Sequence, residues 1–600
     1  MKQIIFIFTL FTIINASIVT SDCGAEANTV TCKFDDSSNT LTIDGKGKMS
    51  PNYPWMTFND VTVKLVVKGE IPTIIASSFS SFKVLELVEI GANVTSIEKS
   101  AFEGCLRLSS VRTIGSSKLE TIGASSFKNC NKLALFSTIK VKTIEADAFN
   151  GCSLLPAFFF NHVETIGDSA FKNSGIKYVD FGASLKSFGK DVFLGCENLY
   201  SIKLVEENEN FWSSGDVLYG KKNDVNQILV YPPAKDSPTY VIDERAELIP
   251  SNTFAYVEKL IRIEFGNGIK RIDSYAFQSC SKLCDVIIGT GLKTINEVPF
   301  TGCYNLMKFE VDECNPNYAT QNGVLYSKYI NNEALLLYPS AKKDTSFTTP
   351  LGIKKIGTSA FSQQHYLEEV IIANDVVQIQ QYAFSGMTRL KKVTIKSALK
   401  SIGTHAFYGC SNLEEVIFED NVKMIGNYMF AECAKLSTFT ISSSSSNLLT
   451  IENYAFVGTA VKQVTIPDKV KYVMDYAFSD CISLESVSIG KNVQELSMGV
   501  FMNCHQLKTV TFATEKLRRI DPYTFGNCLT LTQIDIPSTV EIISDNAFGY
   551  CVSLTKVNFK GSRQPAYCSP TAFSNSLFLN VVVPKNYQQL QFCGKEVTKE

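Results

Sequence analysis

Histidine, cysteine and serine supply many catalytic nucleophiles, bases and metal ligands, and this 600-residue chain groups few of them together. Its four histidines, His162, His365, His405 and His505, stand far apart in the sequence. The sequence contains no phosphate-binding loop, zinc-protease helix, calcium-binding loop or nucleophile elbow. The strings GTSAF and GDSAF belong to a repeat, so their serines suit helix N-caps better than nucleophiles. We therefore expect a protein that is not an enzyme, with no catalytic residue, metal site or cofactor.

Composition narrows the class further. Hydrophobic residues make up 45% of the chain and charged residues 19%, which is enough to bury a core and too apolar for a disordered chain. Lys and Arg number 57 against 59 Asp and Glu, which gives a net charge of -2. That balance provides no electrostatic basis for binding nucleic acid.

The N-terminus indicates an export signal, assigned to residues 1–21. Lys2 precedes an apolar run over residues 4–14, which is too short to span a bilayer but suits the core of a signal peptide. Cleavage is predicted near Ser21, and cleavage after Ala16 is the alternative. No other segment reaches the roughly 18 apolar residues of a membrane helix, so we expect no transmembrane segment in the mature chain.

A phenylalanine recurs through most of the chain, usually every 22 to 26 residues. Its positions are 79, 102, 127, 149, 171, 193, 254, 277, 300, 361, 384, 407, 430, 456, 478, 501, 525, 548 and 573. Ile nearly always lies five residues before this Phe, Cys commonly lies three residues after it, and Leu lies six after it, followed by a V-x-I type pair. Several columns that recur together indicate one structural unit stacked many times.

The spacing within the unit predicts its local structure. Ile, Ala, Phe and Cys at 0, +4, +5 and +8 match one face of a short helical turn, and V-x-I has the period of a strand. A unit of about 23 residues cannot bury its own apolar face, so neighbouring units must stack. The predicted fold is an α/β repeat solenoid of short parallel strands with short helical or 3-10 segments. Phe407→Ala should then cost about 3–5 kcal/mol.

The unit I-x-x-x-A-F-x-x-C-x-x-L-x-x-V-x-I resembles the BspA-like (Treponema pallidum type) leucine-rich repeat of bacterial and protist surface proteins. The resemblance covers about residues 70 to 580. Cys23, the run over residues 41–49, Pro54 and Trp55 look like the C-G…L-x-I-x-G-x-G-x-M…P-W sequence that precedes such arrays. The resemblance implies a leucine-rich-repeat protein that is secreted or displayed at the cell surface and acts in adhesion and host interaction.

These patterns predict one continuous curved solenoid flanked by caps. The predicted parts are the signal peptide at 1–21, an N-terminal capping region at 22–69, the repeats at 70–580 and a C-terminal cap at 581–600.

Two steps between phenylalanines are 61 residues long and hold the same insertion, at about 205–245 and 312–350. Each insertion contains V-L-Y and Y-P and two β-type runs separated by a polar turn, which predicts a β-hairpin projecting from the solenoid edge. A brace over a bend is the favoured role. If exposed, Phe211, Trp212 and Tyr318 are candidate binding contacts.

The 18 cysteines fall into two groups. The twelve that follow Phe by three residues should form one buried column and stay reduced. Cys23 and Cys32 flank a short N-terminal segment and are expected to bond. Cys568 occupies the Ile column of the last repeat, where it is either a core residue or the partner of Cys593.

The residue between Val and Ile of each strand should point outward and form a candidate binding face. From 394 to 511 this column is mostly hydroxylated, and its members are Thr394, Ile417, Thr440, Thr465, Ser488 and Thr511. Thr and Ser also suit an exposed strand without any binding role. Asn93 begins a sequon and is a candidate glycosylation site.

The best-supported function is a secreted or cell-surface scaffold for adhesion and protein interaction. Its expected partners are protein or glycan ligands on host cells or extracellular matrix. A soluble receptor or decoy with one ligand is the alternative, and an enzyme with an unrecognised site is the third hypothesis.

Overall fold

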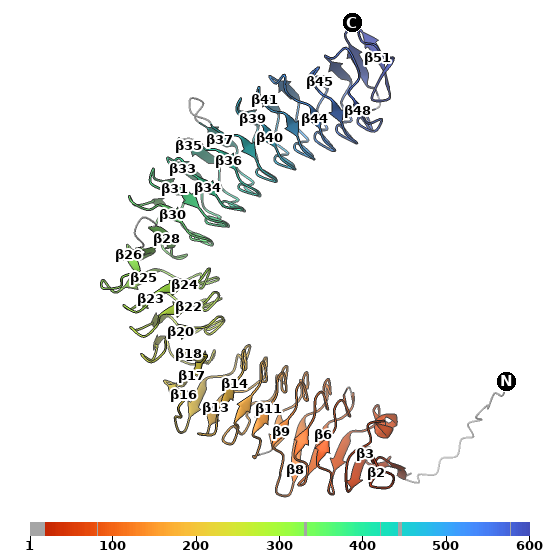
Figure 1. The fold of residues 1–600 in the computed structure, drawn as a ribbon, viewed down its shortest axis with the longest axis vertical. Helices are drawn as coiled ribbons and strands as arrows, with labels where there is room; N and C mark the ends of the chain where they lie inside the picture. The colour runs from red at the N-terminus through yellow and green to blue at the C-terminus, as the bar shows by residue number, and fades with distance from the viewer. Residues whose placement is uncertain are drawn as a thin grey trace, which may run out of the picture. The chain divides into compact units, whose positions relative to one another are not determined.

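The computed structural model describes residues 18–80, 82–137, 139–328, 333–419, 422–441, 447–576 and 578–600. These residues divide into two compact units. The first runs to Pro238 and includes Arg245–Lys259, and the second comprises Thr239–Glu244 and Leu260–Glu600. Both are stacks of similar coils in which a short strand, a turn and a long strand follow one another, so that each stack carries two strand ladders (Figure 1).

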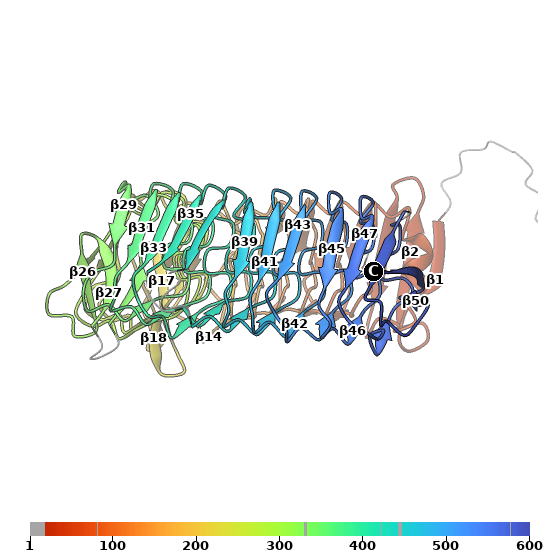
Figure 2. The same ribbon diagram turned by 90° about the horizontal axis from the view of Figure 1, so that it is seen from above.

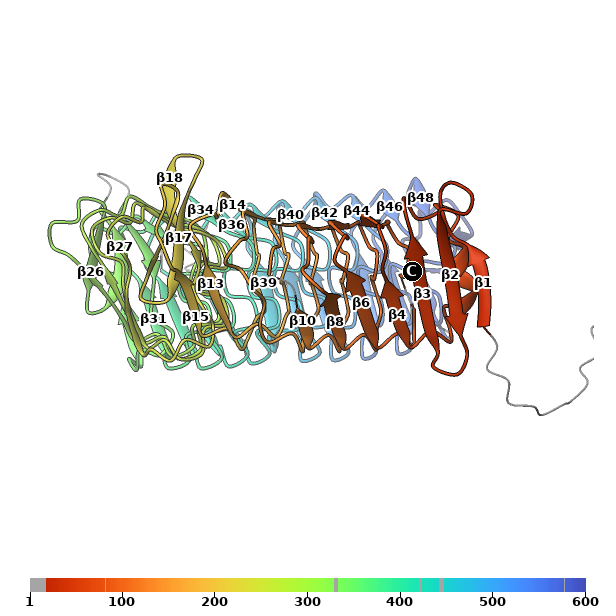
Figure 3. The ribbon, with the colours of Figure 1, turned by 90° about the horizontal axis from the view of Figure 1, so that it is seen from below.

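In the first unit an antiparallel N-terminal segment leads into a parallel ladder of long strands (Figure 3). Its strands are β1 (Ile18–Asp22), β2 (Val30–Asp35), β3 (Thr40–Gly45), β4 (Lys64–Val67), β6 (Leu87–Gly91), β8 (Ser110–Ile114) and β10 (Leu135–Ser137), followed separately by the pair β13 (Tyr178–Phe181) and β15 (Ser201–Leu204). The short-strand ladder contains β5 (Thr73–Ile74), β7 (Ser96–Ile97), β9 (Thr121–Ile122), β11 (Thr143–Ile144), β12 (Thr165–Ile166) and β14 (Ser187–Phe188).

The long strands of the second unit form four parallel groups (Figure 2). The first is β19 (Thr239–Val241), β21 (Arg262–Glu264), β23 (Asp285–Ile288) and β25 (Lys308–Val311), and the second is β29 (Ser346–Thr348), β31 (Glu369–Ile372), β33 (Lys392–Ile395), β35 (Glu415–Phe418) and β37 (Thr438–Ile441). The third is β39 (Gln463–Ile466), β41 (Ser486–Ile489) and β43 (Thr509–Phe512). The last is β45 (Gln533–Ile536), β47 (Lys556–Phe559), β49 (Asn580–Val583) and β51 (Lys595–Lys599), with β50 (Gln591–Phe592) antiparallel to β51.

The short strands of the second unit lie on the other side of the coils. They begin with β22 (Arg271–Ile272) and β24 (Thr294–Ile295), and continue with β30 (Lys355–Ile356), β32 (Gln378–Ile379) and β34 (Ser401–Ile402). The last group is unbroken and contains β36 (Met424–Ile425), β38 (Thr450–Ile451), β40 (Tyr472–Val473), β42 (Glu495–Leu496), β44 (Arg519–Ile520), β46 (Ile542–Ile543) and β48 (Tyr567–Cys568).

Helical segments were predicted around each Phe, and this prediction is wrong. Within the described ranges the only helix is the 3-10 helix η1 (Pro54–Phe58), outside the repeats. In the coil of Phe102, Ser100 and Gly104 both have positive φ, at 54° and 74°, which a right-handed helix cannot accommodate. The N–H groups of Ser100, Phe102 and Gly104 instead donate to carbonyls of the next coil. The +4, +5 and +8 spacing therefore marks a turn whose backbone bonds run between coils.

The apolar columns predicted from the repeat form the core. The Phe rings stack face to face from coil to coil, with centroids 5.2 Å apart for Phe102 and Phe127 and 4.8 Å for Phe384 and Phe407. The column thiols lie beside these rings and donate hydrogen bonds to the Phe carbonyl of the preceding coil, as Cys504 does to Phe478 at 3.2 Å. The parallel stacking predicted from the sequence is thus confirmed in each unit.

The 61-residue steps hold more than the two-stranded hairpin that was predicted. The first contains three antiparallel strands, β16 (Phe211–Ser214), β17 (Val217–Lys222) and β18 (Val225–Val230), and β18 pairs in parallel with the short strand β20 (Leu248–Ile249). The second repeats this arrangement with β26 (Tyr318–Gln321), β27 (Val324–Ser327), β28 (Ala334–Leu337) and β30. Tyr231 and Tyr338 then contact the following Phe rings, with centroids 4.7 and 5.0 Å apart, the first pair tilted and the second stacked. Each insertion therefore continues the stack. Its last strand takes a place in the short-strand ladder, and its Tyr takes a place in the column of Phe rings.

The predicted leader falls largely outside the described residues. Its last four residues, 18–21, belong to β1, which pairs antiparallel with β2. At the other end of the chain, Cys568 and Cys593 join the last coil to the C-terminal strands through a disulfide with a Cα separation of 4.9 Å.

Candidate binding face

The six outward residues predicted as a binding face lie in one column on the long strands of the second unit. Neighbouring members are register partners in two runs, Thr394–Ile417–Thr440 and Thr465–Ser488–Thr511. In the second run the two threonines are exposed and the serine between them is half-buried. The short side chains leave the face of this sheet low and polar.

Thr394 does not belong to the exposed part of this column. Its side chain is only 6% exposed, and its register partners on the two flanking strands are Ile371 and Ile417. These larger β-branched neighbours cover it, so the prediction that Thr394 faces solvent is wrong. The accessible part of the column runs from the half-buried Ile417 through Thr440.

The long-strand ladder is interrupted between β37 and β39, directly between Thr440 and Thr465. The two strands are not paired, and most of their Cα atoms lie more than 8 Å apart. A groove of about 640 Å³ lies there. Its rim carries Thr440, Thr465 and Lys469.

The floor of this groove is apolar. Core residues Leu448, Phe456 and Phe478 line it from below. Phe439 and Val464 belong to the inward Val column of the long strands, yet both are only half-buried. Val370, Val393, Val416 and Val487 of the same column are buried, so the break in the ladder brings two core positions to the surface.

A second, shallower groove of about 850 Å³ follows where β43 and β45 are not paired. Thr511 and Thr509 lie along one side and Asp535 along the other. Asp535 accepts a hydrogen bond from the Asn558 amide at 2.6 Å and pairs with Lys560 at 3.4 Å. This groove is therefore more polar than the one between β37 and β39.

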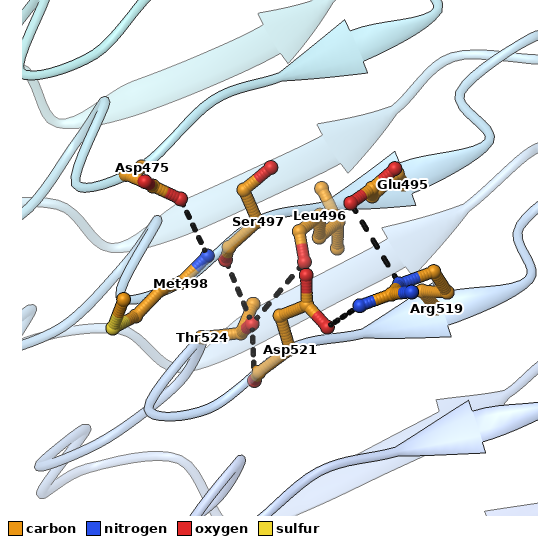
Figure 4. Close-up of polar contacts among 8 residues, drawn as sticks. All are labelled: Asp475, Glu495, Leu496, Ser497, Met498, Arg519, Asp521 and Thr524. Atoms are coloured by element: carbon orange, nitrogen blue, oxygen red, sulfur yellow. Dashed lines mark hydrogen bonds and ion pairs between the residues drawn. The ribbon is translucent and has the colours of Figure 1, made fainter.

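A group of charged residues lies on the opposite, short-strand side of the same coils (Figure 4). Arg519 pairs with Asp521 at 2.8 Å and with Glu495 at 3.7 Å. Burial raises the pKa of Glu495 above its ordinary value, and the negative charge of Asp521 adds to this shift. Asp475 accepts a hydrogen bond from the Met498 backbone N–H at 3.1 Å. One arginine thus partly compensates two carboxyl groups, and the arrangement suits structural pairing.

The aromatic residues that were candidate insert contacts if exposed are buried. Phe211 is 4% exposed, Trp212 6% and Tyr318 3%. Trp212 stacks on Tyr219 with ring centroids 5.4 Å apart, and the Arg245 guanidinium lies 4.7 Å from its centroid. A cation over an aromatic face is stabilising, so these residues brace the insertion.

Tyr318 has a similar bracing position in the second insertion. Its hydroxyl donates to the Lys293 carbonyl at 3.2 Å and accepts from the Ile295 N–H at 3.0 Å. The ring therefore ties the insertion to the preceding short strand, β24.

Asn93, the candidate glycosylation site, is half-buried between coils. Its amide nitrogen donates to the Gly69 carbonyl at 3.0 Å, and its amide oxygen accepts from the Lys118 amine at 3.0 Å. Both ends of the side chain thus have partners in the folded chain. Attachment of a glycan at Asn93 stays a prediction.

The cysteines divide as two bonded pairs and one buried column. Cys23 and Cys32 form a disulfide that joins β1 and β2 at their ends, and their Cα atoms are 5.6 Å apart. The twelve column thiols are free and buried. Burial raises the pKa of Cys481 to about 12, which makes its thiolate scarce and the thiol unreactive at neutral pH.

No candidate metal centre exists within the described parts of the chain, where histidine, cysteine and carboxylate side chains nowhere gather in threes. Searching those same residues also finds no helix with the length and hydropathy needed to cross a membrane.

Phe439 and Val464 were missed as candidate surface residues because the repeat places both in the buried column. A signal was present in the sequence. The step from Phe430 to Phe456 is 26 residues, and the next step, to Phe478, is 22. A long unit followed by a short one displaces the strands between them.

The stacked coils define a leucine-rich-repeat solenoid. A family model described as "BspA type Leucine rich repeat region" matches residues 58–154, 134–214, 238–333, 338–450 and 449–580. The chain belongs to this BspA-type leucine-rich-repeat family, which confirms the resemblance seen in its sequence.

Several of the solved structures that the chain is similar to are bacterial leucine-rich-repeat proteins. A leucine-rich repeat protein from Eubacterium ventriosum is 20% identical, with 90% of this chain and 96% of that chain covered and a TM-score of 0.31. A leucine rich cell surface protein from Faecalibacterium prausnitzii is 20% identical over 82% of this chain and 95% of that one, with a TM-score of 0.31. The T. pallidum leucine rich repeat protein is 24% identical over 36% of this chain and 86% of its own, with a TM-score of 0.27. No curated protein matches the chain significantly.

Proposed function

We propose that this chain is a secreted or surface-displayed scaffold that binds protein or glycan ligands on host cells or in the extracellular matrix. The binding surface in this proposal is the long-strand face of the second unit, between Ile417 and Asp535. One observation carries the proposal: on this face the ladder opens into two adjacent grooves flanked by exposed hydroxyl residues. Membership of a repeat family without a catalytic motif fits a scaffold better than an enzyme.

Two features support export. The disulfides Cys23–Cys32 and Cys568–Cys593 are typical of proteins that fold in an oxidising compartment. The apolar N-terminal run is typical of a signal peptide. We infer cleavage after Ala16 rather than near Ser21, because the later cut would remove β1 from its pairing with β2.

Binding assays with the exported chain test the proposal. The probes are immobilised extracellular-matrix proteins, a glycan array and cultured host cells. Thr465→Glu combined with Thr511→Glu should abolish binding, because two carboxylates then stand on the proposed face. The matched control, Arg112→Glu with Lys203→Glu, changes two outward positions of the first unit and should leave binding intact. Binding that survives the first pair of substitutions, with melting temperatures unchanged, would remove the face from the proposal.

The apolar floor of the groove between β37 and β39 favours a second candidate, a receptor or decoy with one defined ligand. A scaffold should bind several probes with modest affinity and lose binding gradually as contacts are removed. A single-ligand receptor should bind one probe and lose it through one substitution in the groove. The breadth of binding in the same assays separates the two.

A further inference from the structure

We propose that the groove between β37 and β39 receives an extended segment of a partner protein, which pairs with both strands and completes the long-strand ladder. This inference rests on the proposed binding role of the long-strand face and names the class of partner. It follows from the backbone of the groove, its width and its floor.

Among the residues that the structure describes, the backbone groups on the two sides of the groove do not bond to one another. In the next pair of coils the carbonyl of Lys462 accepts hydrogen bonds from the N–H groups of Glu485 and Ser486, at 2.8 and 3.3 Å. The equivalent groups across the groove are the carbonyl of Ser437 and the N–H of Gln463, and within the described residues no backbone bond joins them. In a parallel ladder, alternate residues of each strand present both N–H and C=O groups to the same side, so both sides of the groove offer donors and acceptors that an extended peptide can complement.

The two sides of the groove lie too far apart to pair directly. Paired strands lie about 4.8 Å apart, so a strand inserted between two others needs them about 9.6 Å apart. Most Cα atoms of β37 and β39 are separated by more than 8 Å, whereas the short strands β38 and β40 of the same coils remain paired. The coils thus stay joined on one side and open on the other.

The floor specifies the side chains of the incoming segment. An intact long strand such as β41 places two apolar residues inward and one residue outward, here Val487, Ile489 and Ser488 respectively. In the groove, Phe439 and Val464 lack such a neighbour and are half-buried. A segment with the pattern apolar-x-apolar would cover both, with its middle residue in the outward column between Thr440 and Thr465.

A comparable defect in the first unit is closed. The coil of Phe171, like the coil of Phe456 that contains β39, is one residue shorter than the usual repeat. In the coil of Phe171, however, the N–H of Lys177 donates to the Pro156 carbonyl of the preceding coil at 3.0 Å. Phe158 and Phe160 are buried beside it. A short coil alone therefore does not open a groove. The coil of Phe430 differs because it carries extra residues after its long strand.

Amide hydrogen exchange on the unmodified full chain tests the proposal. The probe is a synthetic peptide with the sequence of residues 484–491, LESVSIGK, which has the required pattern. The amides of Gln463 and Thr465 should exchange rapidly in the free chain and slow by about tenfold or more when the peptide is added. A peptide with aspartate in place of its valine and isoleucine, and one N-methylated at the same two positions, should give no protection.

Substitutions in the groove separate backbone pairing from side-chain recognition. Val464→Asp places a charge on the floor and should weaken peptide binding about tenfold or more, because the apolar anchor would then be buried against a carboxylate. Thr440→Ala and Thr465→Ala remove outward side chains but keep the backbone, and should leave binding unchanged. If Val464→Asp fails to fold, the exchange experiment on the native chain still decides.

Four results would overturn the inference. Protection of Gln463 and Thr465 in the free chain would mean that the chain fills the groove itself. Protection that rises with protein concentration would assign the groove to a second copy. Equal protection by the N-methylated peptide would exclude backbone pairing. Binding of matrix proteins or glycans that never alters exchange at these amides would reject the insertion of a partner strand and leave the proposed function in place.

Conversely, peptide protection without binding to any matrix, glycan or cell probe would support strand insertion into the groove and reject the proposed function.

Discussion

The two sides of the coils between residues 424 and 568 differ in continuity. The short strands from β36 to β48 form one unbroken ladder, whereas the long strands of the same coils are interrupted before β39 and after β43. The sequence supplies the reason. Five residues always separate the short-strand Ile position from Phe, but the distance onward from Phe varies: 21 residues separate Phe430 from Ile451, and 17 separate Phe456 from Val473. All variation in length therefore falls on the long-strand side, which is where the grooves lie.

The largest expected effect concerns the column shared by both sides. Phe501 is buried and stacks on Phe478 and Phe525, with centroids 5.6 and 5.5 Å apart. Phe501→Ala should lower the free energy of unfolding by about 3–5 kcal/mol, because it removes a ring that the coils cannot close around. Urea denaturation followed by circular dichroism measures this. Thr511→Ala is the control on the outward face of the same coil, and should change stability by less than about 0.5 kcal/mol.

Proline substitutions test the interrupted ladder directly. The N–H of Ser486 is bonded to the Lys462 carbonyl of the preceding coil, so Ser486→Pro should cost about 1–3 kcal/mol, because it removes that bond and places a proline ring inside a paired strand. The N–H of Gln463 faces the groove, so Gln463→Pro should cost clearly less. Melting temperatures of the two variants give the comparison. Equal losses would mean that β39 is paired in solution and that the two sides do not differ.

The cysteine column tests whether its thiols contribute hydrogen bonds as well as volume. Cys504→Ala should lower stability by about 1 kcal/mol, because the Phe478 carbonyl loses its S–H donor and a small space opens. Cys504→Ser keeps a donor and should cost less. Ser174 and Thr459 already occupy this column position in two other coils. If alanine and serine were equivalent in urea denaturation, the thiol would matter only for packing.

The smallest effect is expected on the charged short-strand side. The pKa of Glu495 is raised in the folded chain, so its stabilising contribution is present at low pH and is lost as the pH rises through the folded pKa. Glu495→Gln should therefore raise the melting temperature slightly at neutral pH and have little effect near about pH 4.

Glu485 provides the matched control with the opposite sign. The side-chain bond with Lys508 lowers the pKa of Glu485, so its contribution is present above the unfolded pKa and is lost as the pH falls. Glu485→Gln should slightly lower the melting temperature at neutral pH. The same pH dependence for both variants would contradict the assigned shifts.

The parts of the fold predicted correctly are those fixed by apolar periodicity. The Phe, Ile and thiol columns follow from spacing, because each coil must bury the same face against its neighbours. The helical turns were predicted wrongly because Ile, Ala, Phe and Cys have a helix-like spacing, while the left-handed residues Ser100 and Gly104 redirect the backbone bonds to the next coil.

The candidate site was predicted only in part. The outward column could be located from the V-x-I pattern, but the burial of Thr394 depends on the size of its neighbours on adjacent strands. The sequence left open whether Trp212 and Tyr318 are exposed, and they are buried because each insertion continues the stack.

The sequence by itself determined that this chain stacks similar coils around columns of Phe, Ile and Cys, because a repeated apolar face of about 23 residues can be buried only against its neighbours. Only the tertiary structure decided which strand edges remain unpaired. A backbone hydrogen bond depends on the distance between two coils, and that distance is set by the lengths of both coils and by what fills the space between them. The extra residues after β37 and the short coil that follows are each visible in the sequence, but the groove between β37 and β39 arises only where they meet.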